Sequence, residues 1–323
     1  MFADSTKIML RALSTIIAAA YILAISTVSC SRAAPTPEGE PGLSIAVSIL
    51  PQAYFAQRIA GDRARVLTLV GPGASPHSYE LSPRQLADLS RASVWFITGI
   101  EFENALLPKI SSLYPTLAIV DAVKDAEFRL MEAHDHEEEA DELHDGETDE
   151  AQGQELDHDE ESAMDPHTWL GPQGAKTQAA AIRDALTAID PDGAKVYSDN
   201  YEVFAREVDG LFARLTLELA PLRGATVFVY HPAFGYFLDA FGIKQEAVET
   251  GGKEPTPKQL ADLVERASAD GARVLFVQKQ FPSASARAVA DAIGGVVVEM
   301  DDLAEDWARN LERMAAALRK AIR

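Results

Sequence analysis

Short apolar runs and amphipathic segments alternate along most of the chain. Four runs rich in Val, Ile and Leu lie between residues 43 and 120, and four more lie between residues 225 and 300. Short strands that alternate with helical segments are typical of parallel β-sheets covered by helices, so the pattern predicts an α/β fold. The predicted strands are Leu43–Ile49, Arg65–Val70, Ser93–Thr98, Thr116–Val120, Ala225–Tyr230, Ile243–Val248, Arg273–Val277 and Gly295–Met300.

One long amphipathic segment separates the two groups of strands. Apolar residues recur at steps of three to five positions from Pro191 to Ala220, which predicts a helix of about 30 residues and roughly 45 Å. We therefore expect an N-terminal lobe over residues 43–190 and a C-terminal lobe over residues 221–323, joined by a stiff spine helix over residues 191–220. The apolar positions of this helix are Val196, Tyr201, Phe204, Val208, Leu211, Leu215 and Leu219.

The first thirty residues have the features of an export signal. Lys7 and Arg11 precede an apolar run, residues 12–28, and the only cysteine of the chain follows at Cys30. A single cysteine allows neither an intramolecular disulfide nor a cysteine-based metal cluster. The stretch TVSC, which ends at Cys30, resembles the lipobox of bacterial lipoproteins, in which the cysteine is lipidated and becomes the mature N-terminus.

Two alternatives to lipidation remain open from the sequence. A signal peptide cleaved near SRAA (residues 31–34) is one, and a retained membrane helix is the other, although the apolar run is short of the ~20 residues that span a bilayer. Residues 31–42 are rich in Pro and Gly and are expected to form a tether. Each interpretation places the protein outside the cytoplasm.

The acidity of the chain is concentrated in one segment. Between Asp125 and Asp165, nineteen Asp and Glu residues accompany one basic residue, Arg129, so this segment carries −18 of the net charge of −21. So much like charge cannot bury enough apolar surface to offset the ordering entropy, and residues 127–163 are expected to form a disordered loop. Its field would repel nucleic acid. The loop has four histidines: His134, His136, His144 and His158. We interpret it as an accessory, weak metal-binding segment, with a solvated acidic linker as the alternative.

The other three histidines share a context that favours a metal site. Each lies beside a turn residue near the end of a predicted strand: His77 in GPGASPHSYE, His167 in MDPHTWLGP and His231 in VYHPAFGYF. Asp301 follows the strand Gly295–Met300. Ligands of open α/β sheets bind beside the carboxyl ends of strands. Three neutral imidazoles and a carboxylate can form a tetrahedral zinc site, whereas any one of these histidines alone could be a loop residue bonded to the backbone.

Five segments together resemble a known family: PGASPHSYELSPRQLADL, DPHTWLGP, HPAFGYFLDAFGI, EPTPKQLADL and EMDDLAEDW. The resemblance is to the metal-binding lipoproteins that serve ABC importers of zinc and manganese, and it extends from Leu43 to Arg323. It implies two lobes, each with a parallel-rich β-sheet flanked by helices, joined by one long rigid helix, with the metal between them. The ligands that it implies are His77, His167, His231 and Asp301. The zinc members also have a loop rich in His, Asp and Glu at this place in the chain.

The resemblance also implies a function. The protein is expected to capture Zn²⁺ in the periplasm or at the cell surface and to deliver it to an ABC permease with its ATPase subunit; Mn²⁺ is the alternative cargo. We expect a monomer without enzymatic activity, anchored to the membrane by lipid at Cys30. A zinc-dependent hydrolase is less favoured, because no H-E-x-x-H pairing occurs in the sequence and four protein ligands can close the coordination shell.

The last motif departs from the family's usual pattern. The family usually has Asp-Pro-Leu there, and this chain has Asp301, Asp302 and Leu303. Either aspartate could therefore face the metal, and the position in the motif favours Asp301.

Overall fold

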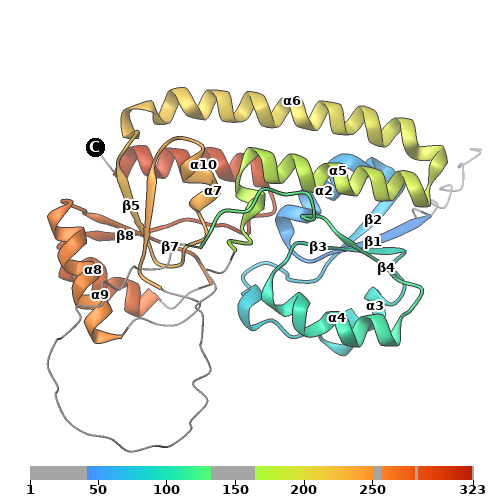
Figure 1. The fold of residues 1–323 in the computed structure, drawn as a ribbon, viewed down its shortest axis with the longest axis horizontal. Helices are drawn as coiled ribbons and strands as arrows, with labels where there is room; N and C mark the ends of the chain where they lie inside the picture. Colours follow the sequence, from blue (N-terminus) through green and yellow to red (C-terminus); the bar gives the residue numbers. More distant parts are fainter. Residues whose placement is uncertain (1–41, 132–163, 250–255, 281–282, 322–323) are drawn as a thin grey trace, which may run out of the picture. The chain divides into compact units, whose positions relative to one another are not determined.

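Two four-stranded parallel sheets organise the part of the chain that the structure describes (Figure 1). The computed structural model describes residues 42–131, 164–249, 256–280 and 283–321. All of these belong to one compact unit that begins at residue 41. The predicted signal segment with Cys30 and the four histidines of the acidic segment lie outside the described residues.

The N-terminal sheet has the strand order β2-β1-β3-β4, and each strand is parallel to its neighbours. Its central strands β1 and β3 are largely buried, with Ala46 and Phe96 wholly so. The four strands are β1 (Leu43–Val47), β2 (Ala64–Thr68), β3 (Val94–Ile97) and β4 (Ala118–Asp121). The helical segments of this lobe are α2 (Leu50–Ala60), η1 (Gly61–Arg63), η2 (Pro76–Ser78), α3 (Pro83–Leu89) and α4 (Glu101–Leu113).

The C-terminal sheet repeats this plan with the order β6-β5-β7-β8, again parallel throughout. The eight predicted strands all occur, with boundaries that differ by one or two residues. The strands of this sheet are β5 (Thr226–Val229), β6 (Lys244–Ala247), β7 (Val274–Val277) and β8 (Val296–Glu299). Its helices are α7 (Gly235–Asp239), α8 (Pro257–Ala269), α9 (Ser283–Ala292) and α10 (Trp307–Ala321).

A long helix connects the lobes, as the periodicity predicts. The helix α6 covers Ala194–Leu219 and is followed by η5 (Ala220–Leu222). The elements before it are η3 (Thr168–Leu170), α5 (Pro172–Ile189) and η4 (Pro191–Gly193). Its 26 residues correspond to about 39 Å. It packs against α5 and α2 on the N-terminal side and against α10 on the C-terminal side (Figure 1). The predicted fold class of two parallel-sheet lobes joined by a spine helix is therefore confirmed.

The buried face of α6 differs from the predicted one at its start. Phe204, Val208 and Leu215 are buried, as the pattern indicates, but Val196 is 41% exposed. Tyr197, one position further along, is buried instead. Consecutive residues of a helix are rotated by about 100°, so only one of the two can face the core. Here the larger aromatic ring takes that position, and its hydroxyl bonds to Asp190.

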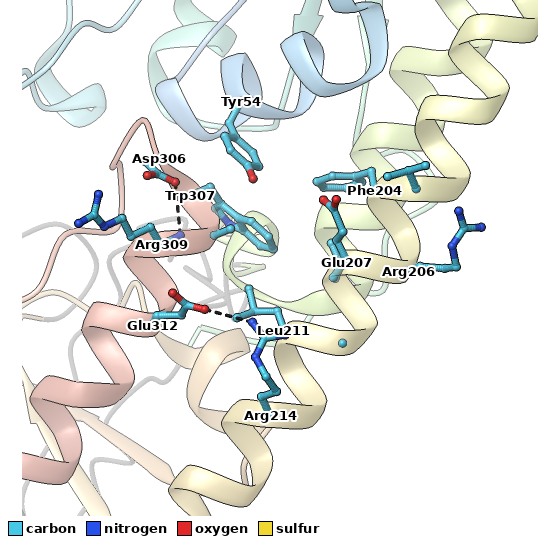
Figure 2. A pocket seen from close by; sticks show the side chains of 14 residues that line it. Tyr54, Phe204, Arg206, Glu207, Leu211, Arg214, Asp306, Trp307, Arg309 and Glu312 are labelled. Atoms are coloured by element: carbon cyan, nitrogen blue, oxygen red, sulfur yellow. Dashed lines mark hydrogen bonds and ion pairs between the residues drawn. The ribbon is translucent and has the colours of Figure 1, made fainter.

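Trp307, at the start of α10, marks the junction of the two lobes and α6. Its ring lies 5.3 Å from that of Phe55, centroid to centroid, and its Nε1 donates to the Trp169 carbonyl at 2.7 Å. Trp169 Nε1 in turn donates to the Asp302 carbonyl at 2.8 Å. The two indoles thereby tie the loop after His167 to the loop after β8. Figure 2 shows that Trp307 also lines a groove of about 640 Å³ between α2, α6 and α10.

Candidate metal centre

Three turns carry the histidines that the sequence analysis singled out. His77 lies in η2, after β2, and the Ser75 hydroxyl caps this turn by accepting the His77 N–H at 3.3 Å. His167 immediately precedes η3, and His231 lies two residues beyond the end of β5. The carboxyl ends of parallel strands share one edge of each sheet, which accounts for the positions of the His77 and His231 turns. His167 differs from the prediction, because the last described strand before it, β4, ends at Asp121.

The structure brings these three imidazoles to one point. Their ligand nitrogens all lie within 4.8 Å of one another, and Nε2 of His167 is 3.4 Å from Nε2 of His231. Two nitrogens bound to zinc at 2.0–2.1 Å with tetrahedral angles are roughly 3.4 Å apart. The centroid of the His231 ring lies 4.6 Å from that of His77 and 5.2 Å from that of His167. The spacing of the His167 and His231 nitrogens therefore suits two ligands of one tetrahedral ion, and the His77 nitrogen lies within 4.8 Å of both.

Each imidazole is bonded through its other nitrogen to a carboxylate. Nδ1 of His77 lies 2.7 Å from Glu101 Oε2, and Nδ1 of His167 lies 2.8 Å from Asp165 Oδ1. Nδ1 of His231 lies 2.8 Å from Glu249 Oε2. A carboxylate on Nδ1 fixes the tautomer and the orientation of a ligating histidine and directs Nε2 at the metal. The three bonds therefore orient all three rings toward a common centre.

These three carboxylates are not among the site residues predicted from the sequence. Asp165 precedes His167 by two residues, and a search for an acidic neighbour would have found it. Glu101 and Glu249 are 24 and 18 residues from their histidines. Each follows a strand of its sheet, β3 and β6, so the strand order that places the histidines also places their carboxylates.

The surroundings shift the pKa values of the histidines in opposite directions. Burial of the His231 ring, which is 2% exposed, lowers its pKa to about 4. Burial is the largest influence on His77 and acts to lower its pKa. The hydrogen bond to Glu101 and the charges of Glu101, Glu249 and Asp302 together outweigh burial and raise that pKa above its ordinary value. The same bond lowers the pKa of Glu101. At neutral pH the His231 imidazole is therefore unprotonated, whereas His77 holds a proton more readily.

The two aspartates after β8 have different surroundings. Asp301 Oδ1 accepts the Leu303 N–H at 3.0 Å, and its Oδ2 lies 3.6 Å from Lys279 Nζ. Asp302 is 6% exposed, and its Oδ1 is buried without a hydrogen-bond partner. Burial raises the pKa of Asp302 to about 6, and the charges of His167 and His77 oppose this rise. In the described part of the chain, the group of donor atoms within 4.8 Å of one another contains the three histidines and neither aspartate.

Known proteins similar to this chain include zinc-uptake and manganese-binding proteins. The model of the ZnuA family, zinc-uptake complex component A, periplasmic, matches residues 45–321. The high-affinity zinc uptake system protein ZnuA of Yersinia pestis is 27% identical over 272 residues, which cover 80% of this chain and 86% of that protein. The manganese-binding lipoprotein MntA of Halalkalibacterium halodurans is 26% identical over 234 residues, or 71% of this chain and 69% of that protein. A crystal structure of ZnuA matches with a TM-score of 0.75 and 32% identity, and the match covers 86% of this chain and 98% of that one.

Proposed function

The chain belongs to the zinc-uptake complex component A family, and we propose that it captures Zn²⁺ outside the cytoplasm and delivers it to the permease of an ABC importer with its ATPase subunit. The observation that carries the proposal is the convergence of His77, His167 and His231, each backed by a carboxylate. Neutral nitrogen donors in a low-coordinate shell suit zinc. Zinc is the cargo of this site.

The surroundings of the imidazoles support a carrier rather than a zinc hydrolase. A catalytic zinc keeps an open position for water and needs a general base beside it. Glu101, Asp165 and Glu249 are each engaged by an imidazole Nδ1, so they orient ligands instead of facing a water molecule. His167 and His231 are 3% and 2% exposed, which leaves little access for an organic substrate.

We propose that the fourth donor comes from the pair after β8. The position in the motif favours Asp301, whereas the surroundings favour Asp302. Asp301 has a backbone N–H and Lys279 as partners. Asp302 has a buried oxygen without a hydrogen-bond partner and interacts electrostatically with His167 and His77. A buried carboxylate without a partner is costly, and a bound cation would relieve that cost.

The remaining parts of the proposal concern regions outside the described residues. We propose that Cys30 is lipidated and anchors a monomer to the membrane, and that His134, His136, His144 and His158 bind additional zinc weakly. The export-signal pattern and the acidic composition support these roles. Among the helices that the structure describes, none has the length and apolar character of a membrane span.

Removal of the acidic segment is expected to leave one tight zinc site. Deleting residues 132–161 removes all four accessory histidines and none of the three that converge. Calorimetric titration of the full chain should therefore show one tight zinc and further weak binding, and the deletion variant should keep only the tight one. A variant with the four loop histidines replaced by alanine is the matched control. Loss of the tight site on deletion would overturn the assignment.

Zinc binding is expected to release a proton from His77 in mildly acidic solution. The pKa of His77 is raised by Glu101, so its imidazolium persists below that pKa and competes with the metal. Apparent zinc affinity should therefore rise with pH up to the raised pKa of His77 and then level off. Folding stability of the metal-free protein depends on pH in the opposite direction. The His77–Glu101 bond stabilises the folded state fully below the unfolded His77 pKa of about 6.5, and this stabilisation is lost as pH rises through the raised pKa of the folded state.

The substitution Glu101→Gln tests this assignment. It removes the interaction that raises the pKa of His77, so fewer protons should be released per zinc near pH 6.5. Calorimetry in buffers of different ionisation enthalpy counts those protons, and Glu207→Gln, at an exposed position of α6, is the control. Equal proton release by wild type and Glu101→Gln would contradict the role given to this pair.

A further inference from the structure

Arg129 lies where the N-terminal lobe meets α7 of the C-terminal lobe. Its Nη1 is 3.1 Å from Asp165 Oδ2, and its Nε is 3.0 Å from Asp239 Oδ2. The guanidinium carbon lies 6.0 Å from the centre of the Tyr236 ring. The side chain is 18% exposed. One cation thus bridges a carboxylate of the first lobe and a carboxylate of the second.

Backbone contacts hold this arrangement in place. The Arg129 N–H donates to the Tyr236 hydroxyl at 3.0 Å, and that hydroxyl donates to the Asp165 carbonyl at 2.8 Å. The Asp165 N–H donates to the Arg129 carbonyl at 2.9 Å. Leu130 and Met164 form an antiparallel bridge beside this pair. Arg129 and Asp165 are therefore fixed against each other and against α7.

The same carboxylate contacts a candidate metal ligand with its other oxygen. Asp165 is fully buried, and its Oδ1 accepts from both the backbone N–H and the ring of His167, at 2.9 Å and 2.8 Å. One oxygen of Asp165 therefore serves His167 and the other serves Arg129. We propose that Arg129 is a positioning residue of the metal site, which acts through Asp165 to orient His167 and ties this ligand to the lobe that carries His231. This inference rests on the proposed zinc site.

The direction in which zinc affinity changes when Arg129 is removed distinguishes the positioning role from a general effect of net charge. Removing a positive charge from a chain with a net charge of −21 should favour cation binding. Loss of the Arg129 guanidinium should instead weaken zinc binding, because the buried Asp165 carboxylate then loses its cationic partner and can turn together with the His167 ring. Loss of an outer-shell partner typically reduces metal affinity about 10–100-fold, and we expect about tenfold here.

Gly235 offers a way to displace the guanidinium without removing its charge. A Cβ at this first residue of α7 would lie 1.6 Å from Arg129 Nη1, so an alanine must push the flexible end of the arginine aside. Gly210 in α6 provides a matched control, because a Cβ there would meet an arginine Nη1, that of Arg214, at a comfortable 3.9 Å.

The experiment compares Arg129→Gln and Gly235→Ala with two controls. Arg206→Gln removes an exposed arginine, 68% accessible, and Gly210→Ala adds the same methyl group elsewhere. Zinc affinity is measured by competition with a chelator, and folding is checked by circular dichroism. We expect about tenfold weaker zinc binding for both test variants and less than a twofold change for both controls. If Arg129→Gln does not fold, Gly235→Ala carries the test.

Two backgrounds show whether the effect passes through His167. In a His77→Ala background the tenfold loss caused by Arg129→Gln should remain, and in a His167→Ala background it should disappear. Equal losses in both backgrounds, or zinc affinity unchanged by both test variants, would overturn the positioning role. Failure of the zinc site itself gives a different result, in which His77→Ala and His167→Ala bind zinc as tightly as the wild type.

Discussion

Replacing His231 with alanine is expected to weaken zinc binding by more than about a hundredfold. Metal-binding free energies of about 10–16 kcal/mol spread over four donors correspond to roughly 3 kcal/mol for each, or about a hundredfold in affinity. The loss should be larger than this share, because Glu249, 4% exposed, would then be left without its imidazole partner. Competition against a chelator of known affinity measures the effect.

Alanine variants of His167, His77 and His158 provide the comparison for the zinc affinity of His231→Ala. His167→Ala should have an effect of similar size, since this ring is as deeply buried and lies opposite His231 at 3.4 Å. His77→Ala should cost less, because its side chain is 29% exposed and water can replace it. His158→Ala should leave the tight site unchanged. Tight one-to-one binding by His231→Ala would remove the basis for the site.

The same titration distinguishes the two aspartates. If Asp302 supplies the fourth donor, Asp302→Asn should weaken zinc binding strongly and Asp301→Asn should have a small effect. The reverse order would support the assignment made from the position in the motif. Both substitutions keep the side-chain volume. A difference in zinc affinity between the two variants therefore shows which carboxylate charge contributes to binding.

The strands and the spine helix could be predicted because they depend on local periodicity. A strand needs only a short apolar run between turns, and α6 needs only a repeat near 3.6 residues. His77 and His231 could be predicted because each follows a strand that is visible in the sequence. The strand-end prediction is wrong for His167, since β4, the last described strand before it, ends at Asp121. The error at Val196 arose because the pattern gave the period of the helix but not which of two adjacent apolar side chains faces the core.

The carboxylate partners depend on tertiary structure and could not be found in this way. Glu101 reaches His77 because β3 lies beside β1, with β2 on its other side, and Glu249 reaches His231 because β5 and β6 are neighbours. The choice between Asp301 and Asp302 depends on the direction of a side chain just beyond β8. Arg129 is the one basic residue of an acidic segment in the sequence, and only the tertiary structure reveals its partners Asp165 and Asp239.

The wild-type site is expected to hold zinc rather than manganese when both ions are supplied equally. Three imidazoles give a nitrogen-rich shell of low coordination number, which zinc accepts without geometric penalty. Manganese is at the weak end of the Irving–Williams order and prefers oxygen donors, so it gains less from the same shell. The 3.4 Å spacing of the His167 and His231 nitrogens agrees with the short bonds of a tetrahedral ion. Elemental analysis after dialysis against both ions measures the ratio.

Replacing the imidazole of His231 with a carboxylate should narrow this preference. His231→Glu alone would place a second carboxylate beside Glu249, whose oxygen lies 2.8 Å from the present ring. Two like charges at that distance favour uptake of a proton instead of a metal ion. The double variant His231→Glu with Glu249→Gln avoids this repulsion and supplies an oxygen donor with a neutral neighbour. We expect its zinc-to-manganese ratio to fall well below that of the wild type, with Glu249→Gln alone as the control. A wild-type protein that takes up manganese in preference would show that the three imidazoles do not determine the cargo, and the zinc assignment would then fail.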